Sequence, residues 1–421
     1  MPVKQAFTYL PTYAADNSAM CSALYELGGM LVMHDASGCN STYTTHDEPR
    51  WFDRPANVFI TALTETDAIL GNEGRLIDDV AQAAAALSPA FIALAGTPIP
   101  MMMGCDYDGL AREIEAKTGV SGIGVDTNGT DDYVAGAGKA FRRFAERFVE
   151  PLDPAAPPAR IPESVNILGV TPLDFSVNGT AETIDAWAME QGFTLISNWA
   201  MGPFATIERM RRAARASVNW VVSGAGVPTA LFLEERFGTP FVVGAPFGRF
   251  MCSILPEKLR EAARTGRSVN LAAGCRGNFT PSSGSVGGGG MNGAAEPPET
   301  LVIGEAVAAA AIRASLVRDF GMRCAAVMTP LTAQAFLLGA GDGRGLVEED
   351  FRRLLPACRM IVADPFYGHF ARRLAPESPP ECVDLPHEAL SGRIWRDAMP
   401  VLVGEGFNDW FASRASRAPL V

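Results

Sequence analysis

Two cysteines near the start of the sequence have surroundings that suit metal–thiolate chemistry. Cys21 precedes an apolar stretch, and Cys39 follows 18 residues later in the loop HDASGCNSTY. A thiolate ligand of an iron–sulfur cluster is favoured on a loop or at the start of a helix, where backbone N–H groups can hydrogen-bond to sulfur. Ser37 and Gly38 make such a loop, because glycine lets backbone amides approach a sulfide closely. We therefore treat Cys39, together with Cys21 at the start of the preceding helix, as candidate cluster ligands. Spacing alone also allows two buried thiols.

The other cysteines and the histidines show no comparable pattern. Cys252 is expected in the core or a helix and Cys275 at the start of a loop, whereas His369 is expected on a surface helix and His387 in a turn. Three further cysteines lie in or beside predicted strands and are expected to be buried: Cys324, Cys358 and Cys382. No nucleophile elbow, zinc-protease motif or phosphate-binding loop occurs in the sequence. We therefore predict no catalytic residue in this chain.

Composition sets limits on partners and location. The chain has 421 residues, 48% of them hydrophobic, and a formal net charge of −12 without any basic run. Binding to nucleic acid or to an anionic membrane needs clustered lysine and arginine, so neither is expected. No apolar run approaches the length of about 20 residues that a membrane helix needs, and no secretory signal is visible. The sequence predicts a soluble cytoplasmic protein, in which disulfides are rare.

Short apolar runs alternate with helical patterns along the whole chain. This alternation predicts parallel sheets covered by helices on both faces. A proline-rich segment, Pro151–Pro162, and a glycine- and serine-rich segment, 274–293, interrupt the pattern and indicate linkers. We predict an N-terminal α/β domain at 1–150 that carries the cluster cysteines, a second at 163–275 and a third at 298–421. The expected strands are 57–63, 90–95, 121–127, 165–170, 219–223, 240–244, 300–304, 323–328, 360–364 and 382–384.

Several separate segments resemble nitrogenase component 1 and the nitrogenase-like reductases, more closely the β-type subunit than the catalytic α-type. The segment from His34 to Cys39 resembles the loop of this family whose cysteine binds the electron-relay P-cluster. Further similar segments run from Thr64 to Asn72, from Ala95 to Asp108, from Ile123 to Tyr133 and from Leu385 to Arg393. The resemblance implies three Rossmann-like parallel-sheet domains.

The chain departs from this family at the third cysteine. Thr97 stands where the family usually places that residue, and Cys105 follows eight residues later. Either Cys105 replaces the missing ligand, or an oxygen, a water or a partner group completes the cluster; Thr97 and Pro98 could also simply cap the helix that begins there. The candidate cofactor- and metal-binding residues are therefore Cys21, Cys39 and Cys105. The neighbouring Met101, Met102 and Met103 are expected to be apolar filler.

Two neighbouring segments allow more than one interpretation of their role. His34 could donate a hydrogen bond near the cluster or could be a capped loop histidine. The run from His46 to Trp51 has no complete metal geometry, and the resemblance places it across a subunit interface.

The resemblance implies a β-like electron-relay subunit of an oxidoreductase. An ATP-dependent 4Fe-4S iron protein would dock transiently and pass electrons through an interfacial P-type cluster, 8Fe-7S or derived from 4Fe-4S. The electrons would go to a catalytic Fe–S–C cofactor in a homologous α-like partner, within an α2β2 heterotetramer. The specific expectation is a methylthio-alkane reductase that cleaves C–S bonds. The alternatives are a cluster-assembly scaffold of the same superfamily and a metal-free α/β binding protein.

Overall fold

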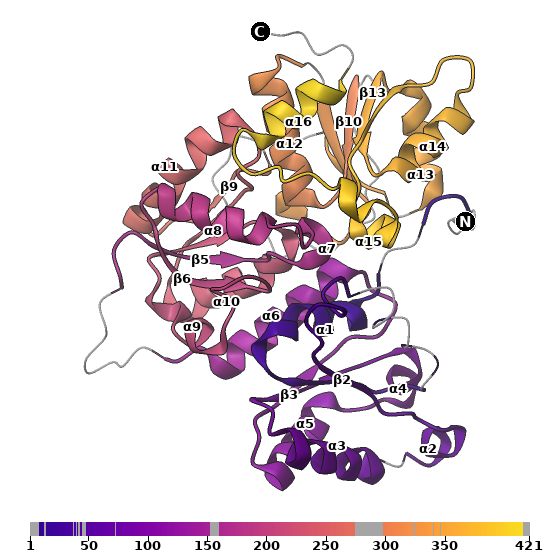
Figure 1. Cartoon of the computed structure of the whole chain (residues 1–421), viewed down its shortest axis with the longest axis vertical. Helices are drawn as coiled ribbons and strands as arrows, with labels where there is room; N and C mark the ends of the chain where they lie inside the picture. The colour runs from indigo at the N-terminus through magenta and orange to yellow at the C-terminus, as the bar shows by residue number, and fades with distance from the viewer. Residues whose placement is uncertain are drawn as a thin grey trace.

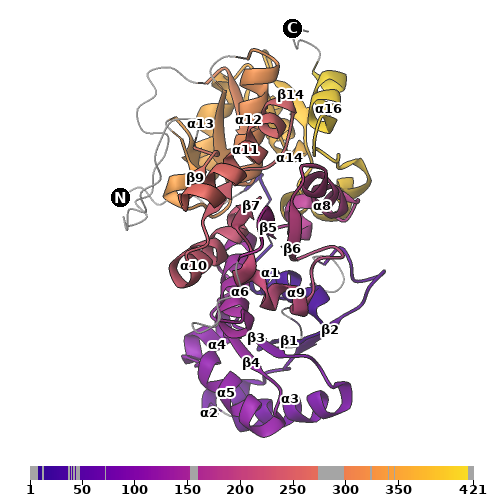
Figure 2. The same cartoon turned by 90° about the vertical axis from the view of Figure 1, so that its left-hand side faces the viewer.

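The computed structural model contains three parallel β-sheets, each covered by helices, stacked along the long axis of the molecule (Figures 1 and 2). It describes residues 8–11, 14–36, 38, 40, 43, 48–71, 73–151, 160–273, 298–322, 325–339, 341–345 and 347–415. Both views place the first sheet at one end of the molecule and the third at the other, with the second between them. The three-sheet α/β architecture predicted from the sequence is confirmed.

The first sheet has the strand order β2-β1-β3-β4. Its strands are β1 (Met30–Met33), β2 (Asn57–Ile60), β3 (Ile92–Ala95) and β4 (Gly122–Val125). Its helices are α1 (Asp16–Leu24), α2 (Glu65–Leu70), α3 (Glu73–Leu87), α4 (Pro98–Met103), α5 (Tyr107–Thr118) and α6 (Tyr133–Phe148). Strand β1 was not predicted, yet it is central and pairs with both β2 and β3.

Alternation along these strands gives the first sheet two distinct apolar faces. Leu31 and Met33 of β1 pack in the core cluster that also contains α1 and α6, whereas Met30 and Val32 pack against α3 and α5. Successive side chains of a strand point to opposite faces, so a residue in one cluster is separated from the other cluster by the sheet. This separation matters for the cysteines described below.

The second sheet has the order β6-β5-β7-β8-β9. It is built from β5 (Ser164–Leu168), β6 (Thr194–Trp199), β7 (Val218–Val221), β8 (Phe241–Val243) and β9 (Val269–Asn270). The accompanying helices are α7 (Pro172–Phe175), α8 (Thr180–Glu190), α9 (Ile207–Arg211), α10 (Val227–Phe237) and α11 (Arg249–Thr265).

The third sheet has the order β12-β11-β10-β13-β14. Its strands are β10 (Thr300–Ile303), β11 (Ala325–Thr329), β12 (Gly343–Arg344), β13 (Met360–Ala363) and β14 (Glu381–Asp384). Its helices are α12 (Ala306–Asp319), α13 (Glu348–Leu354), α14 (Pro365–Leu374), α15 (Glu388–Ser391), the 3₁₀ helix η7 (Gly392–Ala398) and α16 (Gly406–Arg414).

Helix α6 joins the first and second sheets through aromatic packing. The Phe144 ring contacts Phe91, next to β3, with ring centroids 5.4 Å apart, and Trp199 at the end of β6, with centroids 6.1 Å apart. Edge-to-face aromatic pairs of this kind add about 0.5–1.5 kcal/mol to the burial of apolar area. At the other end of α6, the N-cap residue Asp132 accepts a 2.5 Å hydrogen bond from the Thr332 hydroxyl of the third unit. One helix therefore contacts all three units.

Most of the two predicted linkers falls outside the described residues, which omit 152–159 and 274–297. Within the described part of the chain, no helix is both long enough and apolar enough to cross a membrane.

Candidate metal centre

Cys21 is the sixth residue of α1, and every residue of this helix is buried. The expectation that Cys21 starts the helix is therefore corrected. The helix begins at Asp16, whose fully buried carboxylate accepts hydrogen bonds from the backbone N–H groups of Asn128 (2.9 Å) and Gly129 (2.7 Å). These contacts fix the first turn against the segment after β4. The Cys21 thiol consequently lies in the interior of a buried helix.

Cys39 itself lies outside the described residues, but Asn40, which follows it, is described and buried. The Asn40 side-chain carbonyl oxygen accepts a 2.5 Å hydrogen bond from Nδ2 of Asn17, and its Nδ2 donates to Asp35 Oδ2 over 2.5 Å. Asn17 precedes Cys21 by four residues in α1, so both side chains lie on the same side of that helix. The chain position next to Cys39 is therefore held against the side of α1 that carries Cys21.

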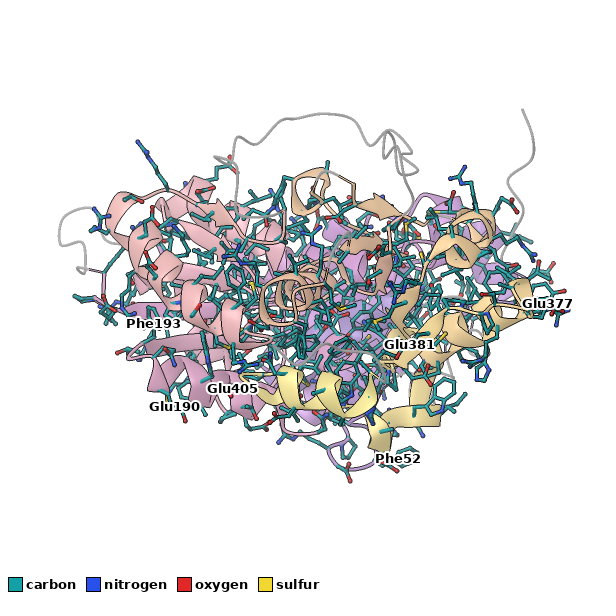
Figure 3. The ribbon with its side chains drawn as sticks, turned by 90° about the horizontal axis from the view of Figure 1, so that it is seen from above. Phe52, Glu190, Phe193, Glu377, Glu381 and Glu405 are labelled. Atoms are coloured by element: carbon teal, nitrogen blue, oxygen red, sulfur yellow. The ribbon has the colours of Figure 1, made fainter. Side chains whose placement is uncertain are left out.

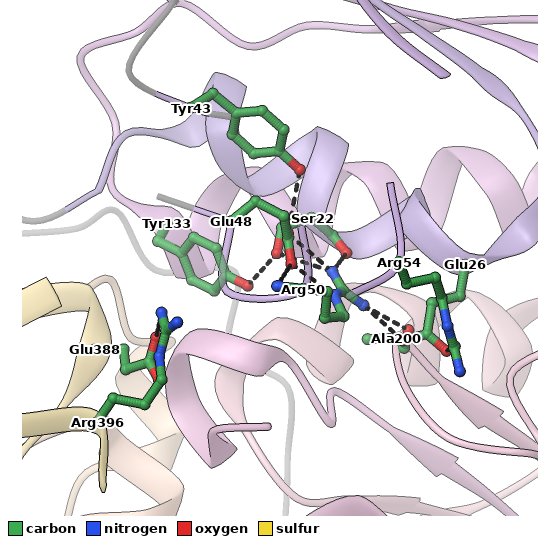
Figure 4. Close-up of polar contacts among 10 residues, drawn as sticks. All are labelled: Ser22, Glu26, Tyr43, Glu48, Arg50, Arg54, Tyr133, Ala200, Glu388 and Arg396. Atoms are coloured by element: carbon green, nitrogen blue, oxygen red, sulfur yellow. Dashed lines mark hydrogen bonds and ion pairs between the residues drawn. The ribbon is translucent and has the colours of Figure 1, made fainter. Parts of the chain in front are cut away.

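A buried ion pair between Glu48 and Arg50 lies next to Ser22, the residue that follows Cys21 in α1 (Figure 4). Arg50 Nε and Nη2 donate to the two carboxylate oxygens of Glu48, over 2.6 and 3.0 Å. Glu48 is completely buried and Arg50 is only 6% exposed. Tyr43, also buried, donates its hydroxyl to Glu48 Oε2 over 3.2 Å. Such bidentate pairing is the geometry in which a buried carboxylate and guanidinium stabilise each other best.

The Arg50 guanidinium also donates hydrogen bonds to three other parts of the chain. Its Nη2 donates to the backbone oxygen of Ser22 in α1 (2.7 Å), and its Nη1 donates to Glu26 Oε1 (3.1 Å) and to the backbone oxygen of Ala200 (3.4 Å). Ala200 follows β6 in the second unit and has a φ of 114°. One guanidinium therefore joins the segment after Cys39, the C-terminal end of α1 and the second unit.

The electrostatics around Cys21 disfavour a free thiolate. Burial, followed by the charge of Glu48, raises the pKa of the Cys21 thiol far above its ordinary value. Burial, followed by Glu48 and Cys21, also raises the pKa of Tyr43. A metal that bound Cys21 would have to displace its proton and supply the positive charge that the thiolate needs.

Cys105 lies on the other face of the first sheet. It is half-buried and packs against the cluster that contains Met30 and Val32, whereas Cys21 belongs to the cluster on the opposite face. Burial, followed by the charge of Glu73, raises the pKa of its thiol. The structure therefore does not bring Cys105 next to Cys21.

Thr97 occupies the N-cap position of α4, with Pro98 in the first turn, as expected if these residues begin the helix. Its hydroxyl nevertheless does not cap the helix but donates to the backbone oxygen of His34 over 2.8 Å. His34 is buried, and its Nδ1 lies 2.8 Å from Thr61 Oγ1. The segment that leads to Cys39 is therefore anchored to both neighbouring strands.

Met101, Met102 and Met103 are the last three residues of α4, and the expectation that they are apolar filler is wrong for Met101 and Met102. Met102 is 83% exposed and Met101 is 45% exposed. Helix α4 contacts α2, in which Ile69 and Leu70 are also exposed. Met101 and Met102 therefore contribute to an exposed apolar patch on α2 and α4 and do not fill a core.

The remaining cysteines and histidines lie mostly where the sequence predicts. Cys358 is buried and Cys252 lies in α11, whereas Cys382 in β14 is only half-buried. His369 is exposed on α14. Cys275 and Cys324 lie outside the described residues.

His387, the N-cap residue of α15, lines a cavity of about 60 Å³ between the second and third units. Its Nε2 lies 3.3 Å from Asp174 Oδ1. Burial alone would lower the pKa of His387, but the hydrogen bond and charge of Asp174 outweigh it and raise that pKa. Burial, followed by the charge of Asp174, raises the pKa of Glu305 in the same cavity to about 7. No cysteine is among the described residues that line this cavity.

The roles of Glu48 and Arg50 were not predicted from the sequence, and the expectation for their segment is corrected. The run from His46 to Trp51 was expected at a subunit interface, but Glu48 and Arg50 are buried within the chain; His46 and Asp47 lie outside the described residues. Opposite charges two residues apart, enclosed by Tyr43 and Trp51, were the available signal. Across the described part of the chain, no three histidine, cysteine or acidic side chains form a metal site by themselves.

Comparison with known proteins identifies the family. Residues 19–286, more than half of the chain, match the family described as nitrogenase component 1 type oxidoreductase. The chain is similar to the nitrogenase iron-molybdenum cofactor biosynthesis protein NifE of Klebsiella pneumoniae, with 29% identity over 196 residues, covering 45% of this chain and 42% of that protein. It is also similar to the nitrogenase molybdenum-iron protein beta chain of Methanothermobacter thermautotrophicus, with 31% identity over 99 residues, covering 24% of this chain and 21% of that one.

These curated matches span less than half the length of the relatives. The solved structure titled nitrogenase Cp1 at pH 6.5 matches over 98% of this chain and 94% of that one, with a TM-score of 0.69 and 16% identity, and shows the shared fold. Together with the family match, these findings establish that the chain belongs to the nitrogenase component 1 type oxidoreductase family.

Proposed function

We propose that this chain is the β-like electron-relay subunit of a nitrogenase-like reductase complex. The observation that carries the proposal is the hydrogen bond between Asn17 and Asn40, which holds the neighbour of Cys39 against the side of α1 that carries Cys21. Cys21 and Cys39 would provide thiolates on one side of an interfacial P-type iron–sulfur cluster. Such a cluster supplies one-electron transfer, at a potential that its ligands and surroundings set.

The residues present fit one side of a shared cluster. The Cys21 thiol is buried next to hydrogen-bonded polar groups, and Oδ1 of Asn17 accepts no hydrogen bond although it is buried. Cys105 remains a candidate for the third ligand on this chain. Its position across the sheet favours the other candidate, a group from the partner subunit. The catalytic Fe–S–C cofactor would lie in the α-like partner.

Two exposed apolar regions of this chain support association with partners. Phe52 is 69% exposed and projects at the edge of the molecule (Figure 3), with the Arg393 guanidinium 5.0 Å from the centre of its ring and the exposed Ile394 next in sequence. We propose this region for the α-like partner, because Phe52 lies only two residues after Arg50 in the sequence. The patch formed by α2 and α4 is proposed for an ATP-dependent iron protein. Exposed apolar patches commonly mark such contacts.

The proposed substrate class is small methylthio-alkanes, cleaved in the partner subunit. Reductive cleavage of CH₃–S–R takes up two electrons and two protons and gives CH₃SH and RH. The substitution of Thr97 for the family's third cysteine supports a reductase distinct from dinitrogen-reducing enzymes.

A second candidate function is a scaffold on which a metal cluster is assembled and passed on. The similarity to NifE, which is titled a cofactor biosynthesis protein, favours it specifically. A third candidate function is that of a metal-free binding protein, which would be colourless after anaerobic purification.

Anaerobic purification tests the cluster assignment. We expect the native chain, copurified with its partner, to be brown and to contain iron and acid-labile sulfide. Cys39→Ala should lose most of the iron, whereas Cys358→Ala, a buried cysteine of the third unit, should retain it. Cys105→Ala then decides the third ligand. Unchanged iron in Cys39→Ala would show that the cluster assignment is wrong.

A further inference from the structure

Two buried oxygen atoms of the second unit lack a hydrogen-bond donor. Nδ2 of Asn198, near the end of β6, donates to Oδ1 of Asp185 in α8 over 2.7 Å. Asp185 is only 2% exposed, and Asn198 is completely buried. The other oxygen of each side chain, Oδ2 of Asp185 and Oδ1 of Asn198, is enclosed and has no hydrogen-bond partner in the described part of the chain. Buried acceptors without a donor are costly, so this pair of side chains needs one more donor.

A single proton on Asp185 would supply that donor. An ionised carboxylate only accepts hydrogen bonds, whereas a protonated carboxyl group has one O–H donor. A carboxylic acid and a primary amide each place one donor beside one acceptor, so the two groups can exchange two parallel hydrogen bonds. A bound cation fits less well, because hard cations take six or more oxygen ligands and the nearby Arg209 of α9 would repel it.

The surroundings of Asp185 favour its protonated form. Burial is the largest cause and, with the charge of the exposed Glu182 on the same helix, raises the pKa of Asp185 to about 7. The hydrogen bond from Asn198 and the charge of Arg209 act in the opposite direction and are outweighed. The Arg209 guanidinium donates elsewhere: its Nη1 donates to two backbone oxygens of β6 (3.3 Å each), and it lies 4.3 Å from the centre of the Phe204 ring.

The pair lies at the base of the loop through which the second unit contacts the first. The backbone N–H of Asn198 donates to the backbone oxygen of Phe204 over 3.1 Å and closes this loop. Inside the loop, Ala200 has a φ of 114°, a strained conformation that persists only where its surroundings hold it. The backbone oxygen of Ala200 accepts a hydrogen bond from Arg50 Nη1 over 3.4 Å (Figure 4). This contact between two units therefore depends on the position of Asn198.

We propose that Asp185 is protonated in the folded chain and forms an acid–amide pair with Asn198, and that loss of this proton loosens the loop that contacts Arg50. On ionisation the proton goes to solvent, and the pair keeps only the hydrogen bond from Nδ2 of Asn198. Two buried acceptors are then left without a donor, so opening of the loop becomes more favourable. The fold thus contains a pH-sensitive junction between its first and second units, which does not depend on a bound cluster.

Infrared difference spectroscopy of the full chain tests the protonation. Asp185→Asn keeps both hydrogen bonds without an ionisable group, because an amide also places one donor beside one acceptor. The native-minus-variant spectrum should show the carbonyl band of a protonated carboxyl group at mildly acidic pH, and carboxylate bands should replace it as pH rises through about 7. Carboxylate bands alone at mildly acidic pH would overturn the inference, since an ionised Asp185 satisfied by a water or a cation would give that result.

Asn198→Ala provides a second test if Asp185→Asn folds poorly. Without the amide partner the Asp185 carboxyl group loses a hydrogen bond, so its carbonyl band should move to higher frequency than in the native chain. An unmoved band would show that the acid is not paired with Asn198.

Hydrogen exchange of the segment 198–205, measured by mass spectrometry, tests the effect on the loop. In the open loop Asp185 would ionise at its ordinary pKa of 3.8, so opening should become up to about tenfold more frequent per pH unit between pH 3.8 and about 7. After correction for intrinsic exchange, Asp185→Asn should show no such rise, whereas Glu182→Gln, the matched control on the exposed side of α8, should keep it. Equal pH profiles of the native chain and Asp185→Asn would refute the pH-sensitive junction.

Discussion

Glu305 is an acid buried at the junction of the second and third units. It is 1% exposed, its Oε1 accepts from the backbone N–H of Gly224 (2.9 Å), and its Oε2 caps α12 through Val307 and Ala308 (3.0 Å each). Burial, followed by the charge of Asp174, raises its pKa from 4.5 to about 7. Between pH 4.5 and about 7, the Glu305 carboxyl therefore keeps a proton in the folded state that it has already released in the unfolded state.

This raised pKa predicts a pH dependence of stability. Below pH 4.5, the pKa of the unfolded state, the raised pKa of Glu305 does not lower the free energy of unfolding. As pH rises from there towards about 7, it lowers the free energy of unfolding by at most about 1.4 kcal/mol per pH unit. The free energy of unfolding of the native chain should fall over this window more steeply than that of Glu305→Gln, as chemical denaturation at several pH values would show. Glu190→Gln, at the exposed end of α8 (Figure 3), is the control and should follow the native chain. Equal slopes for Glu305→Gln and the native chain would contradict this assignment.

Single residues were predictable only where a short motif carried the information. The Cys39 loop could be singled out because glycine and cysteine are adjacent in the sequence. Glu48 and Arg50 could not, since their role depends on α1 and on Ala200, which is 150 residues from Arg50. The position of Cys105 across the sheet could not be predicted either, since it depends on how the segment between α4 and α5 packs against the face of the sheet that carries Met30 and Val32.

At the level of elements, the contact between α1 and α6 determines the position of Cys21. A Cβ atom added at Gly136 of α6 would lie 2.1 Å from the backbone oxygen of Asp16 in α1. The two helices can approach this closely only because residue 136 lacks a side chain.

Gly136→Ala should therefore push α1 away from α6 and destabilise the fold by about 1–3 kcal/mol. Thermal and chemical unfolding of the apo chain measures this loss. Gly304→Ala, where a Cβ would meet only Ala309 at 3.9 Å, should cost much less. Equal stability of the two variants would mean that the α1–α6 contact is not tight.

Elements with clear periodicity were predicted well, and central or short ones were not. The apolar residues of α3 (Glu73–Leu87) recur at the spacing that is typical of a helix. Strand β1 was missed because its four residues, MLVM, continue an apolar run that began in α1. A strand buried on both faces has no alternation to reveal it.

For the whole molecule, the sequence was sufficient to predict three α/β units, because each repeats the alternation of strand and helix. It was not sufficient to predict how they meet. The contacts of α6 with Trp199 and of Asp132 with Thr332 join residues far apart in the chain and leave no local pattern. The candidate centre depends on this assembly, since Arg50 reaches from the first unit to the second.

The most direct test of an electron relay is whether the chain keeps its iron through redox cycles. The complex purified anaerobically with its partner would be reduced by a low-potential donor, reoxidised repeatedly and then incubated with apo-partner protein, while iron bound to this chain is measured. We predict reversible spectral changes and constant iron, both abolished in Cys39→Ala. Iron that moves to the acceptor would identify a scaffold, and native protein without iron would contradict the account.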